Sequence, residues 1–92
     1  MNIYEVIIKE SAQMDLKSLL KSEPAAYKKA LKLIAELYEH PHTGTGKPEP
    51  LSGNRSGQWS RRIIKKHRLV YEIHDTEVIV LVLTAYGHYG EK

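Results

Sequence analysis

The sequence predicts an α+β fold in which two helices pack on one face of an antiparallel sheet. Two segments between residues 11 and 38 carry apolar residues at helical spacing, and three short strand-like segments follow residue 57. One further strand-like segment precedes the helices. The expected order is therefore β-α-α-β-β-β, in a single domain of residues 1–92, since this length suits one domain and not two.

The N-terminal half contains one strand and both helices. Residues 3–8 are rich in Ile, Val and Tyr, which predicts a strand. Ser11 is expected to cap the first helix, and Pro24 is typical of the first turn of the second. The first apolar stripe comprises Ala12, Leu16, Leu19 and Leu20, and the second comprises Tyr27, Ala30, Leu31, Ile34, Leu37 and Tyr38.

The C-terminal half is expected to form a long loop and then a meander of three strands. Residues 41–57 concentrate proline and glycine, and loops of this length in compact domains are often functional. Strands are predicted over 58–64, 68–74 and 78–83, with turns at 65–67 and 75–76. In the middle strand Leu69, Tyr71 and Ile73 should face the helices, while Arg68, Val70 and Glu72 should face an open side.

Composition excludes several classes of protein. Cysteine is absent, so neither a disulfide framework nor a thiolate metal site can form. The N-terminal apolar run is interrupted by Glu5 and does not resemble a signal peptide, and the apolar run 78–83 is too short to span a bilayer. We therefore expect a cytoplasmic protein that has no membrane partner.

Positive charge is concentrated in the second half of the chain. The net charge is +3, but no acidic residue occurs between Glu49 and Glu72. That stretch contains Arg55, Arg61, Arg62, Lys65, Lys66 and Arg68. A basic field of this kind suits a polyanion such as RNA, although a solvated basic surface is an equally good interpretation of charge alone.

Three groups of residues have the chemistry of a reactive site. Pro48 and Pro50 restrict the backbone on both sides of Glu49 and would hold its carboxylate in one orientation, although a stiff surface loop has the same pattern. Arginines on the strands 58–64 and 68–74 can bind phosphate oxygens in pairs. His88 can transfer protons near neutral pH, and the adjacent Tyr89 can stack on a base.

His40 and His42 lie two residues apart but have no third ligand at a diagnostic spacing. We interpret them as part of a loop and expect neither a metal nor another cofactor.

Four segments resemble the YoeB/Txe branch of the RelE superfamily of toxins in their order and spacing. They are Gly46–Leu51, Ser56–Ile63, His67–Tyr71 and His88–Tyr89, and together they extend over about half of the chain. The resemblance implies a RelE-like microbial ribonuclease fold and a ribosome-dependent mRNA interferase. It also implies a YefM/Phd-type antitoxin as partner, beside the ribosome and mRNA. Whether the protein also forms a homodimer is left open.

The resemblance assigns catalytic roles to Glu49, Arg68, His88 and Tyr89, and matches Arg62 to a further arginine of the family. RNA supplies its own nucleophile, the 2′-hydroxyl, so Glu49 would act as general base and His88 as general acid without a metal. Arg68, helped by Arg62, would stabilise the charge that grows on the phosphate. Tyr89 would position the base or the phosphate. Exchanged roles for Glu49 and His88 remain open.

A second set of residues is expected to bind RNA phosphates without taking part in the chemistry. These are Arg61, Arg62, Lys65 and Lys66. Two other functions also fit the sequence: a non-catalytic RNA- or protein-binding module, and a degenerate toxin that acts only as an antitoxin-bound repressor partner.

Overall fold

Two helices and five strands form two layers in the computed structural model, which describes residues 3–51, 53, 57–65, 67–74 and 79–84, the last six by their backbone. The elements are β1 (Glu5–Ile8), α1 (Glu10–Ser22), α2 (Pro24–Leu37), β2 (Glu49–Pro50), β3 (Gln58–Ile64), β4 (His67–His74) and β5 (Ile79–Thr84). The predicted α+β class and element order are confirmed. The strand β2, however, lies inside the segment that the sequence predicts to be loop.

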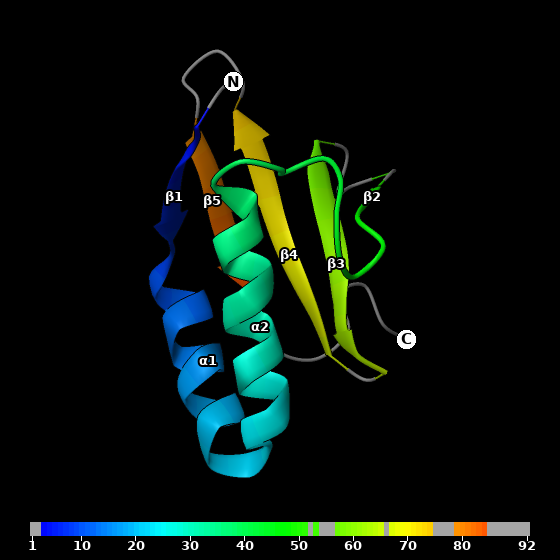
Figure 1. The fold of residues 1–92 in the computed structure, drawn as a ribbon. Helices are drawn as coiled ribbons and strands as arrows, with labels where there is room; N and C mark the ends of the chain where they lie inside the picture. The colour runs from blue at the N-terminus through cyan, green and yellow to red at the C-terminus, as the bar shows by residue number, and fades with distance from the viewer. Residues whose placement is uncertain (1–2, 52, 54–56, 66, 75–78, 85–92) are drawn as a thin grey trace.

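The sheet has the strand order β1-β5-β4-β3-β2, and both helices lie over one of its faces (Figure 1). Strands β2 to β5 pair antiparallel, as expected. The first strand instead pairs parallel with the last, with Glu5 opposite Ile79. The prediction of a wholly antiparallel sheet is therefore wrong at this edge. A parallel pair needs a long connection, and the whole segment from α1 to β4 provides it.

Helix α1 begins one residue earlier than its predicted cap. Lys9 occupies the N-cap position without a side-chain cap, and Ser11 lies inside the helix, so the prediction that Ser11 is the N-cap is wrong. Glu10 in the first turn and Lys21 in the last turn have the charges that the helix dipole favours. Pro24 starts α2, as predicted. Neither described helix has the length and hydropathy that a membrane span needs.

The core lies between the helices and the sheet. Its fully buried helical residues are Ala12, Leu19, Ala30, Leu33 and Leu37, and the sheet adds Ile63, Leu69 and Tyr71. Three residues of the predicted stripes, Leu20, Leu31 and Tyr38, are instead exposed by 43–50%. Leu31 and Tyr38 lie on the outward side of α2, whose buried residues are Ala26, Ala30, Leu33, Ile34 and Leu37.

The second face of the sheet is only partly open. His67 is the register partner of Ile64, so it belongs to β4 and not to the predicted turn. Arg62 opposes Arg68 on the face turned away from the helices. On the same face, however, Ser60 and Val70 oppose each other and are fully buried. The expectation that this face is open is therefore confirmed at Arg62 and Arg68 and is wrong at Ser60 and Val70.

Two adjacent leucines in α1 test this assignment of the core. Leu19 has no exposed surface, whereas half of Leu20 is exposed. We expect Leu19→Ala to lower the free energy of unfolding by about 2–5 kcal/mol, through lost burial and the cavity left behind. Leu20→Ala is the matched control and should change it by about 0.5 kcal/mol or less. Urea unfolding followed by circular dichroism measures both. Equal losses for the two variants would contradict the assignment.

Candidate functional site

The sheet register places Glu49 and both candidate arginines on one face. Glu49 in β2 opposes Ser60 in β3, and Ser60 opposes Val70 in β4. Because facing residues project to the same side, Glu49 shares its face with the Arg62–Arg68 pair two positions along the strands. Strand spacing and rise put the Cα atoms of Glu49 and Arg68 roughly 12 Å apart, which their long side chains can reduce. We call Glu49, Arg62 and Arg68 the polar face.

The polar face carries charge that the rest of the described chain leaves unneutralised. Glu49 and Arg62 are exposed, and Arg68 is half-buried. None of the three forms an ion pair with another described residue. Lys65 is also exposed, at the end of β3. The cationic side chains in this state, Arg62, Arg68 and Lys65, are available to a phosphate ligand.

The other predicted site residues fall outside the described part of the chain. They are His88, Tyr89 and Lys66. Among the predicted catalytic residues, the structure therefore gives the relative positions of Glu49 and Arg68 only. The roles assigned to His88, Tyr89 and Lys66 stay predictions.

The backbone that leads to Glu49 has an unusual local geometry. Gly46 and Lys47 both have positive φ, at 87° and 52°, and Lys47 is the only described non-glycine residue in this region of conformational space. A lysine pays a steric cost there that glycine avoids. The Gly46 carbonyl accepts a hydrogen bond from the Arg62 amide at 2.8 Å. The sharp turn thus brings the chain alongside β3 just before Pro48 and Glu49.

Arg61 occupies the opposite face of β3 and is completely buried. Its Nε donates to the Tyr71 hydroxyl at 3.0 Å. One terminal nitrogen donates to Glu36 at 2.9 Å and to the Thr45 carbonyl at 3.4 Å. The other donates to the carbonyls of His40 and Thr43. We call these six residues, Arg61, Tyr71, Glu36, Thr45, His40 and Thr43, the Arg61 cluster.

The geometry of this cluster corrects the role predicted for Arg61. A guanidinium has five N–H donors, and Arg61 makes five hydrogen bonds inside the protein. No donor is left for an RNA phosphate, and the side chain has no exposed surface to receive one. The physical reason is strand alternation: Trp59, Arg61 and Ile63 all point toward the helices, whereas Arg62 points the other way.

Two polar groups complete the cluster. Glu36 Oε1 accepts from Arg61 and also from the Thr45 amide at 2.9 Å. Burial acts to raise the pKa of Glu36, but the hydrogen bonds from Thr45 and the charge of Arg61 outweigh it, so this pKa is lowered from its ordinary value of 4.5. Burial raises the pKa of Tyr71, despite the Arg61 guanidinium beside it. The protonated Tyr71 hydroxyl donates to the Pro41 carbonyl at 2.9 Å.

Glycines let the loop after α2 approach this cluster closely. A Cβ on Gly44 would lie 2.5 Å from Glu36 Oε1, and one on Gly46 would lie 3.0 Å from the Arg62 carbonyl. Both residues also have positive φ. In Figure 1 the same loop runs from the end of α2 across β4 and β3 to reach β2.

Histidines outside the polar face have structural contacts. His67 is buried, and its Nε2 lies 2.7 Å from Glu23 Oε2, which joins the start of β4 to the corner between the helices. The ring of His42 packs edge-on against Trp59, with 5.2 Å between the ring centroids. The described residues contain no group of three or more His, Asp or Glu side chains arranged to hold a metal ion.

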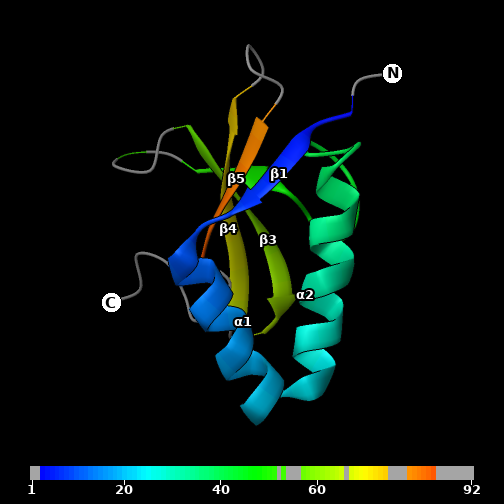
Figure 2. The ribbon, with the colours of Figure 1, turned by 90° about the vertical axis from the view of Figure 1, so that its left-hand side faces the viewer.

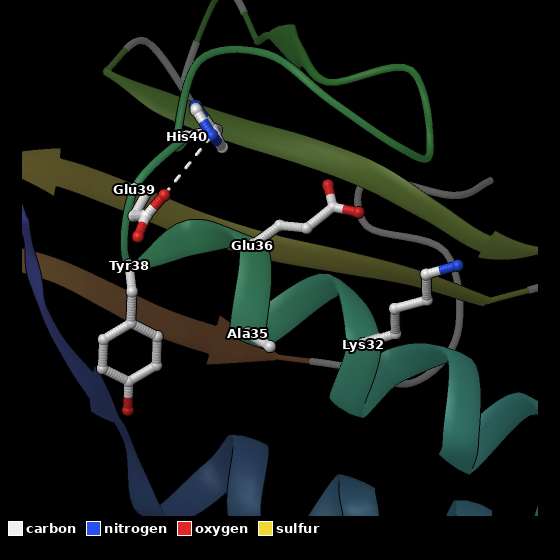
Figure 3. Close-up of a pocket in the computed structure, with 6 residues that line it drawn as sticks. All are labelled: Lys32, Ala35, Glu36, Tyr38, Glu39 and His40. Atoms are coloured by element: carbon white, nitrogen blue, oxygen red, sulfur yellow. Dashed lines mark ion pairs between the residues drawn. The ribbon is translucent and has the colours of Figure 1, made fainter.

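A pocket of about 380 Å³ lies on the outer side of α2, near its C-terminal end (Figure 3). It is lined by Lys32, Ala35, Glu36, Tyr38, Glu39 and His40. Figure 3 shows Glu36 projecting away from Tyr38, and its carboxylate belongs to the Arg61 cluster. The pocket contains none of the residues of the polar face.

Residues 8–89 match the family model described as "YoeB-like toxin of bacterial type II toxin-antitoxin system". The chain belongs to this family. The match includes all of the polar face and the Arg61 cluster. It confirms the resemblance seen in the sequence motifs.

Curated relatives agree with this membership. Over 50 residues the chain is 56% identical to the toxin RelK of Mycobacterium tuberculosis, which covers 54% of this chain and 59% of the relative. The YoeB toxin of Streptomyces coelicolor is 45% identical over 60 residues, covering 65% of this chain and 71% of the relative. The alignment with this chain thus covers less than two thirds of the length of the mycobacterial relative.

Solved structures match over nearly the whole chain. A YoeB/ParE toxin from Agrobacterium tumefaciens is 32% identical with a TM-score of 0.84, covering 92% of this chain and 99% of that one. A YoeB dimer from Staphylococcus aureus is 30% identical with a TM-score of 0.78, covering 94% and 98%. A YoeB–YefM complex from the same organism has a TM-score of 0.77, with the same identity and coverage.

The Arg61 cluster is the part of the site that sequence reasoning missed. Its signal is present in the alternation of β3, because Arg61 falls between Trp59 and Ile63 on the face that carries apolar residues. An arginine at such a position must find internal acceptors. Glu36 and Tyr71 are distant in sequence, and only the tertiary structure identifies them as those acceptors.

The lowered pKa of Glu36 gives stability a defined dependence on pH. Its contribution to the free energy of unfolding is fully present above pH 4.5, the ordinary pKa, and is lost as the pH falls through the lower folded-state pKa. We expect Glu36→Gln to be less stable than wild type at neutral pH, with a difference that shrinks in acid. Urea unfolding between about pH 3 and pH 7 measures this. Glu5→Gln, on the far edge of the sheet, is the control. A difference that is constant with pH would refute the assignment.

Proposed function

We propose that this chain is an endoribonuclease that cleaves mRNA at the ribosome and thereby inhibits translation. The observation that carries the proposal is the polar face, where one exposed carboxylate and two arginines free of described ion pairs lie on neighbouring strands. A carboxylate that removes a proton and a guanidinium that stabilises phosphate charge are two of the groups that RNA cleavage needs.

The reaction uses the 2′-hydroxyl of the RNA as nucleophile. Glu49 removes its proton, and the oxygen attacks the adjacent phosphorus. Arg68, assisted by Arg62, stabilises the additional negative charge on the phosphorane. His88 then protonates the departing 5′-oxygen, and Tyr89 positions the phosphate or a base. The upstream fragment ends in a 2′,3′-cyclic phosphate and the downstream fragment in a 5′-hydroxyl, so neither a metal nor a water molecule is required as nucleophile.

Partners follow from the family and from charge. Staphylococcus aureus YoeB is found in a complex with YefM and also as a dimer. We propose that this chain likewise binds a YefM/Phd-type antitoxin. An acidic antitoxin segment is attracted to the same arginines that bind RNA, and its binding would block Glu49. We further propose that the toxin acts in the cytoplasm, where its ribosomal substrate lies.

Cleavage by translating ribosomes tests the chemistry. We expect Arg68→Ala to reduce the rate by about 10²–10³-fold, because it removes charge stabilisation in the transition state. Glu49→Gln removes the base and should cost up to about 10²–10⁴-fold, less if a ribosomal group replaces it. The matched control is Glu10→Gln, an exposed carboxylate on α1. End analysis of the fragments should find the 2′,3′-cyclic phosphate or its 3′-phosphate product.

A 3′-hydroxyl on the upstream fragment would refute the mechanism, because it requires an external nucleophile. Ribosome binding without cleavage would favour the non-catalytic RNA-binding module. Antitoxin binding without either activity would favour the degenerate toxin that serves as a repressor partner.

Salt dependence tests the phosphate contacts separately. Each lost contact to single-stranded RNA should reduce the slope of log affinity against log salt concentration by about 0.7. We expect this change for Arg62→Ala and for Lys65→Ala, with similar losses across RNA sequences. Lys28→Ala, an exposed lysine on α2, is the control and should leave the slope unchanged. Unchanged slopes for both test variants would show that these side chains contact only solvent.

A further inference from the structure

Strand β2 has few means of holding its own position. It contains two residues, Glu49 and Pro50, at the edge of the sheet. Pro48 and Pro50 have no N–H, so neither can donate to β3. Near β2, hydrogen bonds run from the Leu51 amide to the Gln58 carbonyl and from the Arg62 amide to the Gly46 carbonyl, each at 2.8 Å. A short edge strand with so few donors needs support from outside the sheet ladder.

The Arg61 cluster supplies that support on the side that precedes Glu49. Arg61 binds the carbonyls of His40, Thr43 and Thr45, which are spread along the loop that leads to Gly46. Tyr71 binds the carbonyl of Pro41 in the same loop. Four of the six residues from 40 to 45 are thus attached to β3 or β4. The loop is thus fixed on the helix-facing side of the sheet before it enters the edge strand β2.

Charge balance shows why an arginine serves here. A buried guanidinium needs a counter-charge. Glu36, in the last full turn of α2, provides it, with its Oε1 2.9 Å from a terminal nitrogen of Arg61. The fork of five donors then reaches the Glu36 carboxylate, the Tyr71 hydroxyl and three loop carbonyls at once, whereas a lysine ammonium has only three donors. The cluster thereby joins α2, β3, β4 and the loop in one network, with no buried side-chain polar atom unsatisfied among the described residues.

We propose that Arg61 and Tyr71 are positioning residues, which fix loop 40–46 so that Glu49 is held in register with Arg68 across the sheet. Neither residue touches RNA in this scheme. They act through the loop backbone, by restricting where β2 can lie. The expected effect on RNA cleavage rests on the proposed role of Glu49 as general base. The expected effect on the position of the loop and of β2 does not depend on that role.

The test compares Tyr71→Phe and Arg61→Lys with Ile34→Val. Tyr71→Phe keeps the ring in the core but removes the contacts to Pro41 and to Arg61 Nε. Arg61→Lys keeps the positive charge beside Glu36 but loses the fork of donors. Ile34→Val removes one methylene from the buried side of α2 without altering the cluster, and it controls for general destabilisation. Should Arg61→Lys fail to fold, Tyr71→Phe decides.

Amide hydrogen exchange is the readout independent of activity. The Leu51 and Arg62 amides report on β2 and on the turn before it. We expect both to exchange at least about tenfold faster in the two cluster variants, while core helical amides such as that of Leu33 match those of Ile34→Val. Equal protection of the Leu51 and Arg62 amides in all three variants overturns the proposal, whatever the activity of the protein.

Single-turnover cleavage of ribosome-bound mRNA is the second readout. Displacement of the base should lower the saturating rate by about 10- to 100-fold in the cluster variants, with the half-saturating concentration unchanged. A raised half-saturating concentration at full rate would instead make Arg61 an RNA ligand and overturn the proposal. If wild type cleaves no RNA, the proposed function fails, and the exchange data alone decide whether the cluster positions β2.

Discussion

A single buried guanidinium joins both layers of the structure and fixes the loop between them. Arg61 donates five hydrogen bonds, to one carboxylate, one phenol and three backbone carbonyls. Removing a charge of this kind from water carries a large desolvation cost, which only a complete set of acceptors can offset. The chain supplies that set from α2, β4 and the loop 40–45, and their relative positions are constrained accordingly. The two-residue strand β2 depends on this arrangement.

Adjacent residues of β3 point to opposite faces of the sheet and therefore have different roles, one structural and one chemical. Arg61 and Arg62 are neighbours in β3 with identical side chains, yet one is fully buried and the other is exposed. Strand alternation alone produces this difference. The helix-facing arginine organises the backbone, and the outward-facing arginine shares a face with Arg68 and Glu49. Residue type therefore predicts neither role until the face is known.

The sequence predicts the class of the fold well because hydrophobic period and turn residues are local signals. Both helices, β3 and β4 fall close to their predicted ranges. The errors arise where tertiary contacts decide. The predicted stripe of α2 includes Leu31 and omits Leu33, whereas in the structure Leu33 is fully buried and Leu31 is exposed. The parallel pairing of β1 with β5 and the two-residue β2 depend on contacts between distant segments. For the site, the motif Pro48-Glu49-Pro50 is visible in the sequence, whereas the attachment of its loop through Glu36 and Tyr71 is not.

The parallel edge of the sheet also affects the order in which this protein is assembled during translation. Residues of β1 leave a ribosome before every other described element, but their register partners in β5 leave after all of them, as the pair Glu5 and Ile79 shows. Figure 2 shows the two strands side by side near the viewer. The helical hairpin and the β3–β4 pair involve more local contacts and can form earlier. The β1–β5 edge of the sheet therefore forms only after β5 has been synthesised, when both helices and the β3–β4 pair have already left the ribosome.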